Sequence, residues 1–161
     1  MIAFALLAFL TAAPWSAEHR PRFEDFPVTS IWRGRPAPLH PSTVLPDDWR
    51  IDLPRAAKGP VNFAGRYHFA LWMCGSNCAG GAIVDLSTGR VYQPPLASPA
   101  DGTSYFVMAS TSDGPSIEFR TNSRLLIMKG GPNPINAYYF VWEGNTFRRI
   151  LFVPGAPGRQ P

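Results

Sequence analysis

The chain of 161 residues has few of the side chains that small enzymes use for catalysis. Its histidines are only three, His19, His40 and His68, and its cysteines only two. The G-x-S-x-G pattern of serine hydrolases is absent, as are the H-E-x-x-H pattern of zinc proteases and the glycine-rich P-loop that cradles phosphates. These absences argue against nucleophilic, zinc-dependent and nucleotide-dependent enzymes, and we assign no catalytic residue.

The two cysteines, Cys74 and Cys78, are too few for a structural zinc site, which needs four ligands. His68 would lie about 20 Å from Cys74 along an extended strand, too far to share a metal. Three residues separate the cysteines, whereas thioredoxin-type redox motifs have two. We therefore expect no metal and no cofactor, and we interpret Cys74 and Cys78 as a disulfide that fixes the turn between them. Metal and redox roles are the less favoured alternatives.

The chain also lacks a long apolar run. Residues 2–10 are apolar and the first charged residue is Glu18, but a membrane-spanning helix needs about 20 apolar residues. The run has the length of the apolar region of a secretory signal, although no Lys or Arg precedes it. We expect residues 1–17 to be a cleaved signal peptide, with an uncleaved anchor or a buried segment as alternatives. The expected location is periplasmic or secreted, with no stable membrane span.

The net charge is +4, and the basic residues are spread along the chain, with Arg148-Arg149 as the longest run. Nucleic-acid-binding proteins concentrate Lys and Arg on one face or one helix, so we expect no nucleic-acid partner. A weakly basic surface suits anionic partners in the cell envelope. The expected partner is therefore an envelope protein or a cell-wall component.

Composition and periodicity indicate an all-β fold. The chain is 45% hydrophobic and holds 18 prolines and 14 glycines, which suits many turns and few long helices. Short segments of alternating apolar residues, bounded by turn residues such as Gly89 and Gly144-Asn145, predict strands. We expect a small antiparallel sandwich or barrel built of hairpins, in which residues 103–109 and 116–120 pair. The predicted strands are 66–73, 81–85, 90–93, 103–109, 116–120, 124–129, 137–143 and 146–153.

Eight prolines fall between residues 18 and 60, a density that excludes a long helix or a central strand. We expect residues 18–60 to form a Pro-rich N-terminal arm packed on the body, with a short strand at 28–32 and a helical turn at 54–58. The antiparallel β domain then covers residues 61–153, and a flexible tail covers 154–161. The residues expected to hold the arm to the core are aromatic: Phe26, Trp32 and Trp49.

The carboxylates Asp85 and Glu143 flank predicted turns. In principle they, or Glu118, could pair for glycoside hydrolysis, which needs two carboxylates at a set separation. Asp before a turn more often hydrogen-bonds the nearby backbone, and we prefer that interpretation. A lone histidine on a strand, such as His68, is usually structural as well.

The candidate binding residues are long polar or aromatic side chains on predicted strands: Arg66, His68, Tyr138 and Tyr139. Adjacent residues of a strand point to opposite faces of a sheet. At least one of the two tyrosines could therefore be exposed on a binding surface, and packing on both faces is the alternative.

Several motifs carry a resemblance to known sequences. They are N-F-A-G-R-Y at 62–67, W-M-C-G-S-N-C at 72–78 and A-I-V-D-L-S-T-G at 82–89, followed by S-R-L-L-I-M and Y-Y-F-V-W-E-G-N-T-F. With these motifs the chain resembles a group of uncharacterised exported bacterial proteins, over about residues 58–150. The resemblance implies an exported bacterial domain and no particular activity. Many members have His at the position of Arg66, which argues further against catalysis there.

The preferred function is thus an exported, non-catalytic binding or structural protein, for example of the inhibitor or immunity type. The alternative is a small hydrolase that acts on cell-envelope material. Convergence of Asp85, His68 or Glu143 in one pocket would favour the hydrolase, and an exposed basic or aromatic patch would favour binding.

Overall fold

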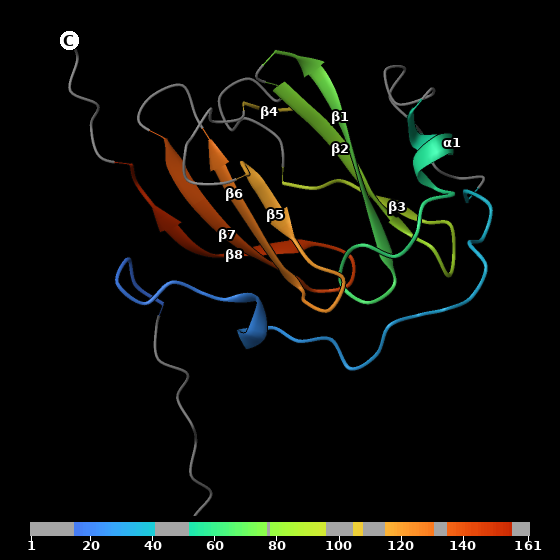
Figure 1. Ribbon diagram of the computed structural model, residues 1–161, viewed down its shortest axis with the longest axis horizontal. Coiled ribbons are helices and arrows are strands. Elements are labelled where there is room, and N and C mark those ends of the chain that lie inside the picture. Colours follow the sequence, from blue (N-terminus) through green and yellow to red (C-terminus); the bar gives the residue numbers. More distant parts are fainter. Residues whose placement is uncertain are drawn as a thin grey trace, which may run out of the picture.

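The computed structural model describes residues 15–40, 52–76, 78–95, 105–107, 115–130 and 135–155. These residues form two four-stranded antiparallel sheets and little helix (Figure 1), which confirms the all-β prediction. In the first sheet, β2 (Cys78–Asp85) lies between β1 (Tyr67–Gly75) on one side and both β3 (Val91–Tyr92) and β4 (Tyr105–Val107) on the other. The second sheet has the simple order β5 (Ile117–Phe119), β6 (Leu125–Gly130), β7 (Asn136–Trp142) and β8 (Phe147–Val153).

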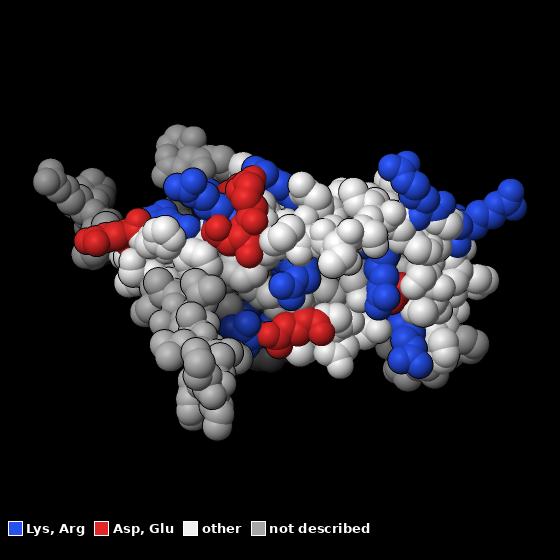
Figure 2. Space-filling view, turned by 90° about the horizontal axis from the view of Figure 1, so that it is seen from below, with Lys and Arg blue, Asp and Glu red and all other residues white. Residues whose placement is uncertain are grey.

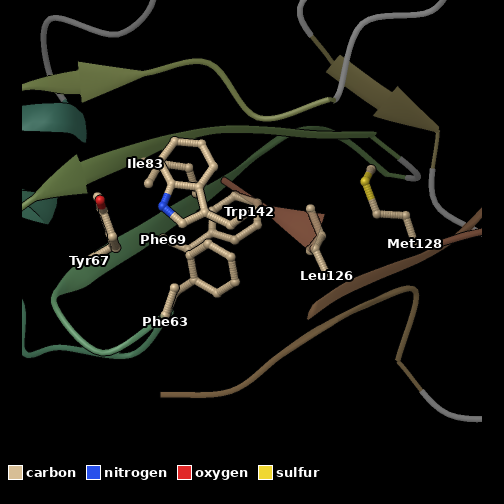
Figure 3. Packing of buried hydrophobic residues seen from close by; sticks show 8 residues of the cluster. Phe63, Tyr67, Phe69, Ile83, Leu126, Met128 and Trp142 are labelled. Atoms are coloured by element: carbon tan, nitrogen blue, oxygen red, sulfur yellow. The ribbon is translucent and has the colours of Figure 1, made fainter. Parts of the chain in front are cut away.

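The two sheets pack face to face around one aromatic core (Figure 3). Phe69 and Ile83 of the first sheet share this core with Leu126 and Trp142 of the second. Strand side chains alternate between faces, which is why residues two apart reach the same core. Phe63 lies between the sheets, with its ring centroid 6.0 Å from that of Phe69 and 6.4 Å from that of Trp142. The fold is therefore a small sandwich.

The N-terminal segments cover the outer faces of both sheets. Phe23, in the short 3₁₀ turn η1 (Phe23–Asp25), packs on Tyr139 and its neighbours on the outside of the second sheet. Leu53, in helix α1 (Asp52–Ala56), packs on Val84 on the outside of the first sheet. After η1, residues 26–40 run along the lower end and then the right side of the sandwich in Figure 1. Within the described ranges, no helix has the length and apolarity needed to cross a bilayer.

Phe26 and Trp32 contact the body as expected, on the clusters outside the second and first sheets respectively. Trp49 lies outside the described residues. The expected strand at 28–32 is wrong. Pro27 forms one isolated bridge with Ser123, and the segment beyond it is held by single backbone hydrogen bonds rather than by a ladder.

The predicted pairing of residues 103–109 with 116–120 is also wrong. β4 pairs with β2 in the first sheet, and β5 pairs with β6 in the second. The short strands β4 and β5 therefore pair with longer strands of different sheets and not with each other. The helical turn lies at Asp52–Ala56 rather than 54–58, and β2 begins at Cys78 rather than Gly81.

The predicted turns at Leu86–Gly89 and Gly144-Asn145 are confirmed, with Gly89 at φ 73° and Gly144 at φ 94°. Of the expected tail, only Pro154 and Gly155 fall within the described residues.

A side chain closes part of the outer edge of β1. The Phe69 N–H donates to Oδ1 of Asn62 at 2.7 Å, and Nδ2 of Asn62 donates to the Phe69 carbonyl at 3.1 Å. The Asn62 amide therefore takes the place of a neighbouring strand at this position. Farther along the same edge, Leu71 and Met73 are 40% and 60% exposed.

A tight loop at residues 63–67 precedes and begins β1. Phe63 and Tyr67 exchange two backbone hydrogen bonds of 3.0 Å each. The chain turns between them because Ala64 and Gly65 both have positive φ, 42° and 80°. A positive φ is easy for glycine and unfavourable for residues with a Cβ. The loop geometry therefore depends on Gly65.

The same loop connects three parts of the molecule through its backbone. The Gly65 N–H donates to the Thr121 carbonyl of the second sheet's β5–β6 turn at 2.7 Å. The Gly65 carbonyl accepts from Trp32 of the arm at 2.7 Å, and the Arg66 carbonyl accepts from Leu86 of the β2–β3 turn at 3.2 Å. Both sheets and the arm are thus hydrogen-bonded to the backbone of two consecutive residues, Gly65 and Arg66.

We predict that Gly65→Ala lowers the free energy of unfolding by about 3 kcal/mol or more. A positive φ costs a residue with a Cβ about 1–2 kcal/mol, and a Cβ at Gly65 would also lie 2.5 Å from the Ser30 carbonyl. Gly144→Ala is the matched control, because Gly144 has φ 94° and open space around its Cβ position. It should lose only the 1–2 kcal/mol. Urea denaturation measures both, and equal losses would contradict the role of the loop.

Candidate functional site

A cavity of about 740 Å³ opens at the end of the sandwich where the 63–67 loop lies. We call it the end cavity; its wall includes Ser30 and Trp32 of the arm, Arg66, Arg124 and the 142–144 segment. Small-molecule sites usually measure about 300–1,000 Å³, so the size is suitable. A second cavity of about 360 Å³, beside Tyr92, has no charged side chain among its described lining residues.

A buried carboxylate holds Arg66 at the wall of the end cavity. Oδ2 of Asp85, whose side chain is 2% exposed, lies 3.2 Å from Nη2 of Arg66. The same nitrogen donates to the Tyr67 hydroxyl at 3.0 Å, and this hydroxyl donates to the Gly144 carbonyl at 3.2 Å. The guanidinium is therefore fixed between the two sheets, while 49% of the Arg66 side chain stays exposed.

Burial opposes the charge of the Arg66 guanidinium. The hydrogen bond to Tyr67 and the charges of Tyr67, Asp85 and Tyr92 outweigh it, so the pKa of Arg66 is raised above its ordinary value. An arginine is already charged throughout the physiological range. Arg66 is thus a permanent cation at the cavity wall.

Asp85 has structural partners for both of its carboxylate oxygens. Oδ1 accepts the Ser87 N–H at 2.9 Å and the Ser87 hydroxyl at 2.6 Å, while Oδ2 faces Arg66. The Asp85 carbonyl also accepts the Gly89 N–H at 2.8 Å. The prediction that Asp85 serves the turn is confirmed. A carboxylate committed in this way is poorly suited to act as a general acid or nucleophile.

Arg124 supplies a second cation. Its Nη1 lies 3.5 Å from the Trp142 carbonyl, a long hydrogen bond, and no acidic side chain in the described part of the chain forms an ion pair with it. Glu143 also lines the cavity, but its Oε1 accepts from Nε of Arg148 at 2.6 Å. The wall therefore carries two guanidinium groups and one carboxylate that already has a basic partner.

The four predicted binding residues do not lie on one surface, and only Arg66 lines the end cavity. His68 donates from Nδ1 to the Pro60 carbonyl at 2.7 Å and does not line the cavity. Tyr139 is buried outside the second sheet. Tyr138 is partly buried and packs on the inner core. The two tyrosines therefore pack on opposite faces of the second sheet, as the alternative interpretation predicted.

Arg124 and Trp142 belong to the site and were not predicted from the sequence. Arg124 follows a turn as an ordinary polar residue, and Trp142 has the pattern of a core residue. The cavity brings them together with Ser30 and Arg66, which are far away along the chain. A single sequence holds no signal for this proximity.

Among the described residues, no three His, Cys, Asp or Glu side chains are grouped so that they could hold a metal ion. Cys78 begins β2 opposite Gly75, the last residue of β1. The side chain of Cys74 lies outside the described part of the structure, so the disulfide stays a prediction.

We predict that Asp85→Ala destabilises the protein by about 1–3 kcal/mol, since it leaves the partly buried N–H and hydroxyl of Ser87 without their acceptor. Asp85→Asn, which keeps an oxygen for Ser87, should lose less. The control is Glu24→Ala: its ion pair with Arg120 is exposed and should contribute at most about 1 kcal/mol. Thermal and urea denaturation of the three variants checks this order. An Asp85→Ala loss no larger than that of Glu24→Ala would contradict it.

A comparison of the chain with protein-family models, with curated proteins and with solved structures finds no match.

Proposed function

We propose that the protein is an exported, non-catalytic binding protein of the bacterial cell envelope, with the end cavity as part of its ligand site. One observation carries the proposal. The side chains that could perform hydrolysis do not converge, since Asp85 is bound to Ser87 and Arg66, and His68 to Pro60. Cationic groups, by contrast, gather at one cavity. An inhibitor or immunity-type protein would be one form of this function.

The short apolar leader, the predicted cysteine pair and the resemblance to exported bacterial proteins support an envelope location. Basic side chains are scattered over the face seen in Figure 2, and acidic ones lie mostly toward its left side. This surface lacks the single basic patch typical of nucleic-acid binding. An envelope protein or a cell-wall component therefore remains the proposed partner.

The competing function is a small hydrolase of envelope material, favoured only by the position of Glu143 in the cavity wall. We predict that the purified protein releases no soluble fragments from peptidoglycan above a heat-inactivated control. A positioned acid or base contributes about 10²–10⁴-fold to a rate. Turnover that falls by this factor in Glu143→Gln or His68→Ala, with folding intact by circular dichroism, would overturn the binding function. Asp85→Asn is the third variant whose turnover is measured.

We predict that the full chain, expressed in a bacterial host, is recovered from the envelope with its N-terminus at about Glu18. We also predict that Cys74 and Cys78 resist alkylation until they are reduced. Mass spectrometry measures both, and Cys78→Ser, which exposes one thiol, is the control. The loop closed by the disulfide is short, so this variant should lose stability at the low end of about 0–5 kcal/mol. Uncleaved cytoplasmic protein, or two reactive thiols in envelope protein, would contradict the prediction.

A further inference from the structure

We propose that the end cavity binds an oxyanion, a carboxylate or phosphate group, on a small molecule that also has an apolar part. This inference rests on the proposed binding function and names the chemistry of its ligand. Three observations carry it: the unused donors of Arg66, the position of Arg124 and the uncharged groups of the wall.

Arg66 is oriented for recognition and keeps donors for a ligand. Its ion pair and its hydrogen bond both use Nη2. The N–H groups of Nε and Nη1 make no hydrogen bond within the described part of the chain. A guanidinium offers five N–H donors in a fixed fork, which matches the paired oxygens of a carboxylate or phosphate. Asp85 and Tyr67 hold this fork in place, so less conformational entropy is lost on binding.

Arg124 approaches the same segment from the second sheet. It contacts the Trp142 carbonyl, and Arg66 reaches the Gly144 carbonyl through the Tyr67 hydroxyl. Carbonyls two residues apart are separated by about 7 Å or less. Both arginines also line the end cavity. An anion in the cavity would therefore be attracted by two positive charges.

The remaining wall suits an oxyanion with an apolar substituent. The hydroxyls of Thr29 and Ser30 add uncharged hydrogen-bonding groups, and the ring of Trp32 adds apolar surface. Trp142 also lines the cavity, and its buried indole N–H has no hydrogen-bond partner among the described residues. In Figure 3 this nitrogen lies on the side of the ring toward Tyr67, which lines the cavity as well.

Glu143 does not reverse this preference. Its carboxylate pairs with Arg148 at 2.6 Å, so its charge is compensated by a residue outside the two cavity cations. Arg66 is likewise paired with Asp85, so Arg124 is the cavity cation that forms no ion pair with an acidic side chain in the described part of the chain. The charge of the wall therefore favours an anion.

The test is a titration of the full mature protein with benzoate, phenyl phosphate and neutral benzamide, followed by calorimetry and tryptophan fluorescence. We expect saturable binding of at least one anion, and binding of benzamide at least tenfold weaker. The stronger of the two anions identifies the ligand as a carboxylate or a phosphate. Arg124→Gln should weaken anion binding about tenfold or more, because it removes a charge-assisted hydrogen bond.

The matched control is Arg149→Gln, which removes the same charge from an exposed position on β8 outside the cavity wall. It should change the dissociation constant less than twofold. Arg66→Lys keeps the charge beside Asp85 but loses the fork, and should also weaken binding while the chain stays folded by circular dichroism.

The inference is overturned if neither anion saturates below about 10 mM, if benzamide binds as tightly as benzoate, or if the Arg124 and Arg149 variants behave alike. None of these outcomes affects the proposed binding function, which turnover of envelope material would refute.

Discussion

The fold depends on the backbone of one glycine. Gly65 accepts from the arm, donates to the second sheet and introduces the first strand of the first sheet. The aromatic core holds the two sheets face to face. The hydrogen bonds at this loop connect the sheets to each other and to the arm at the end where the cavity lies. The candidate ligand site is therefore beside the loop that connects the three parts.

Asp85 connects the folding of a turn to the candidate ligand site. The same carboxylate closes the β2–β3 turn and orients Arg66. A buried ion pair adds little net stability, because desolvation offsets much of the attraction. Its value here lies in direction, since the guanidinium points to the cavity rather than rotating freely in solvent. Stability at the turn and recognition at the cavity thus share one residue.

Local patterns predicted most of the secondary structure. Every strand of the described residues overlaps a segment predicted to be a strand, and Gly89 and Gly144 occur where the turns need positive φ. The sheet to which β4 and β5 belong could not be predicted, because strand pairing is decided by distant partners. The cavity was missed for the same reason: Ser30, Arg66 and Arg124 meet only through tertiary contacts. Arg66 alone was identified, from its position on a strand.

The Asn62 amide gives the protein a chemical vulnerability. Its Nδ2 donates to the Phe69 carbonyl at the outer edge of β1, and unpaired strand edges invite pairing with other chains. Deamidation to aspartate would replace this donor with a negatively charged oxygen that faces a carbonyl. The edge would then be open from Phe69 to the exposed Leu71 and Met73. Deamidation of Asn62 would therefore expose a strand edge with which another chain can pair.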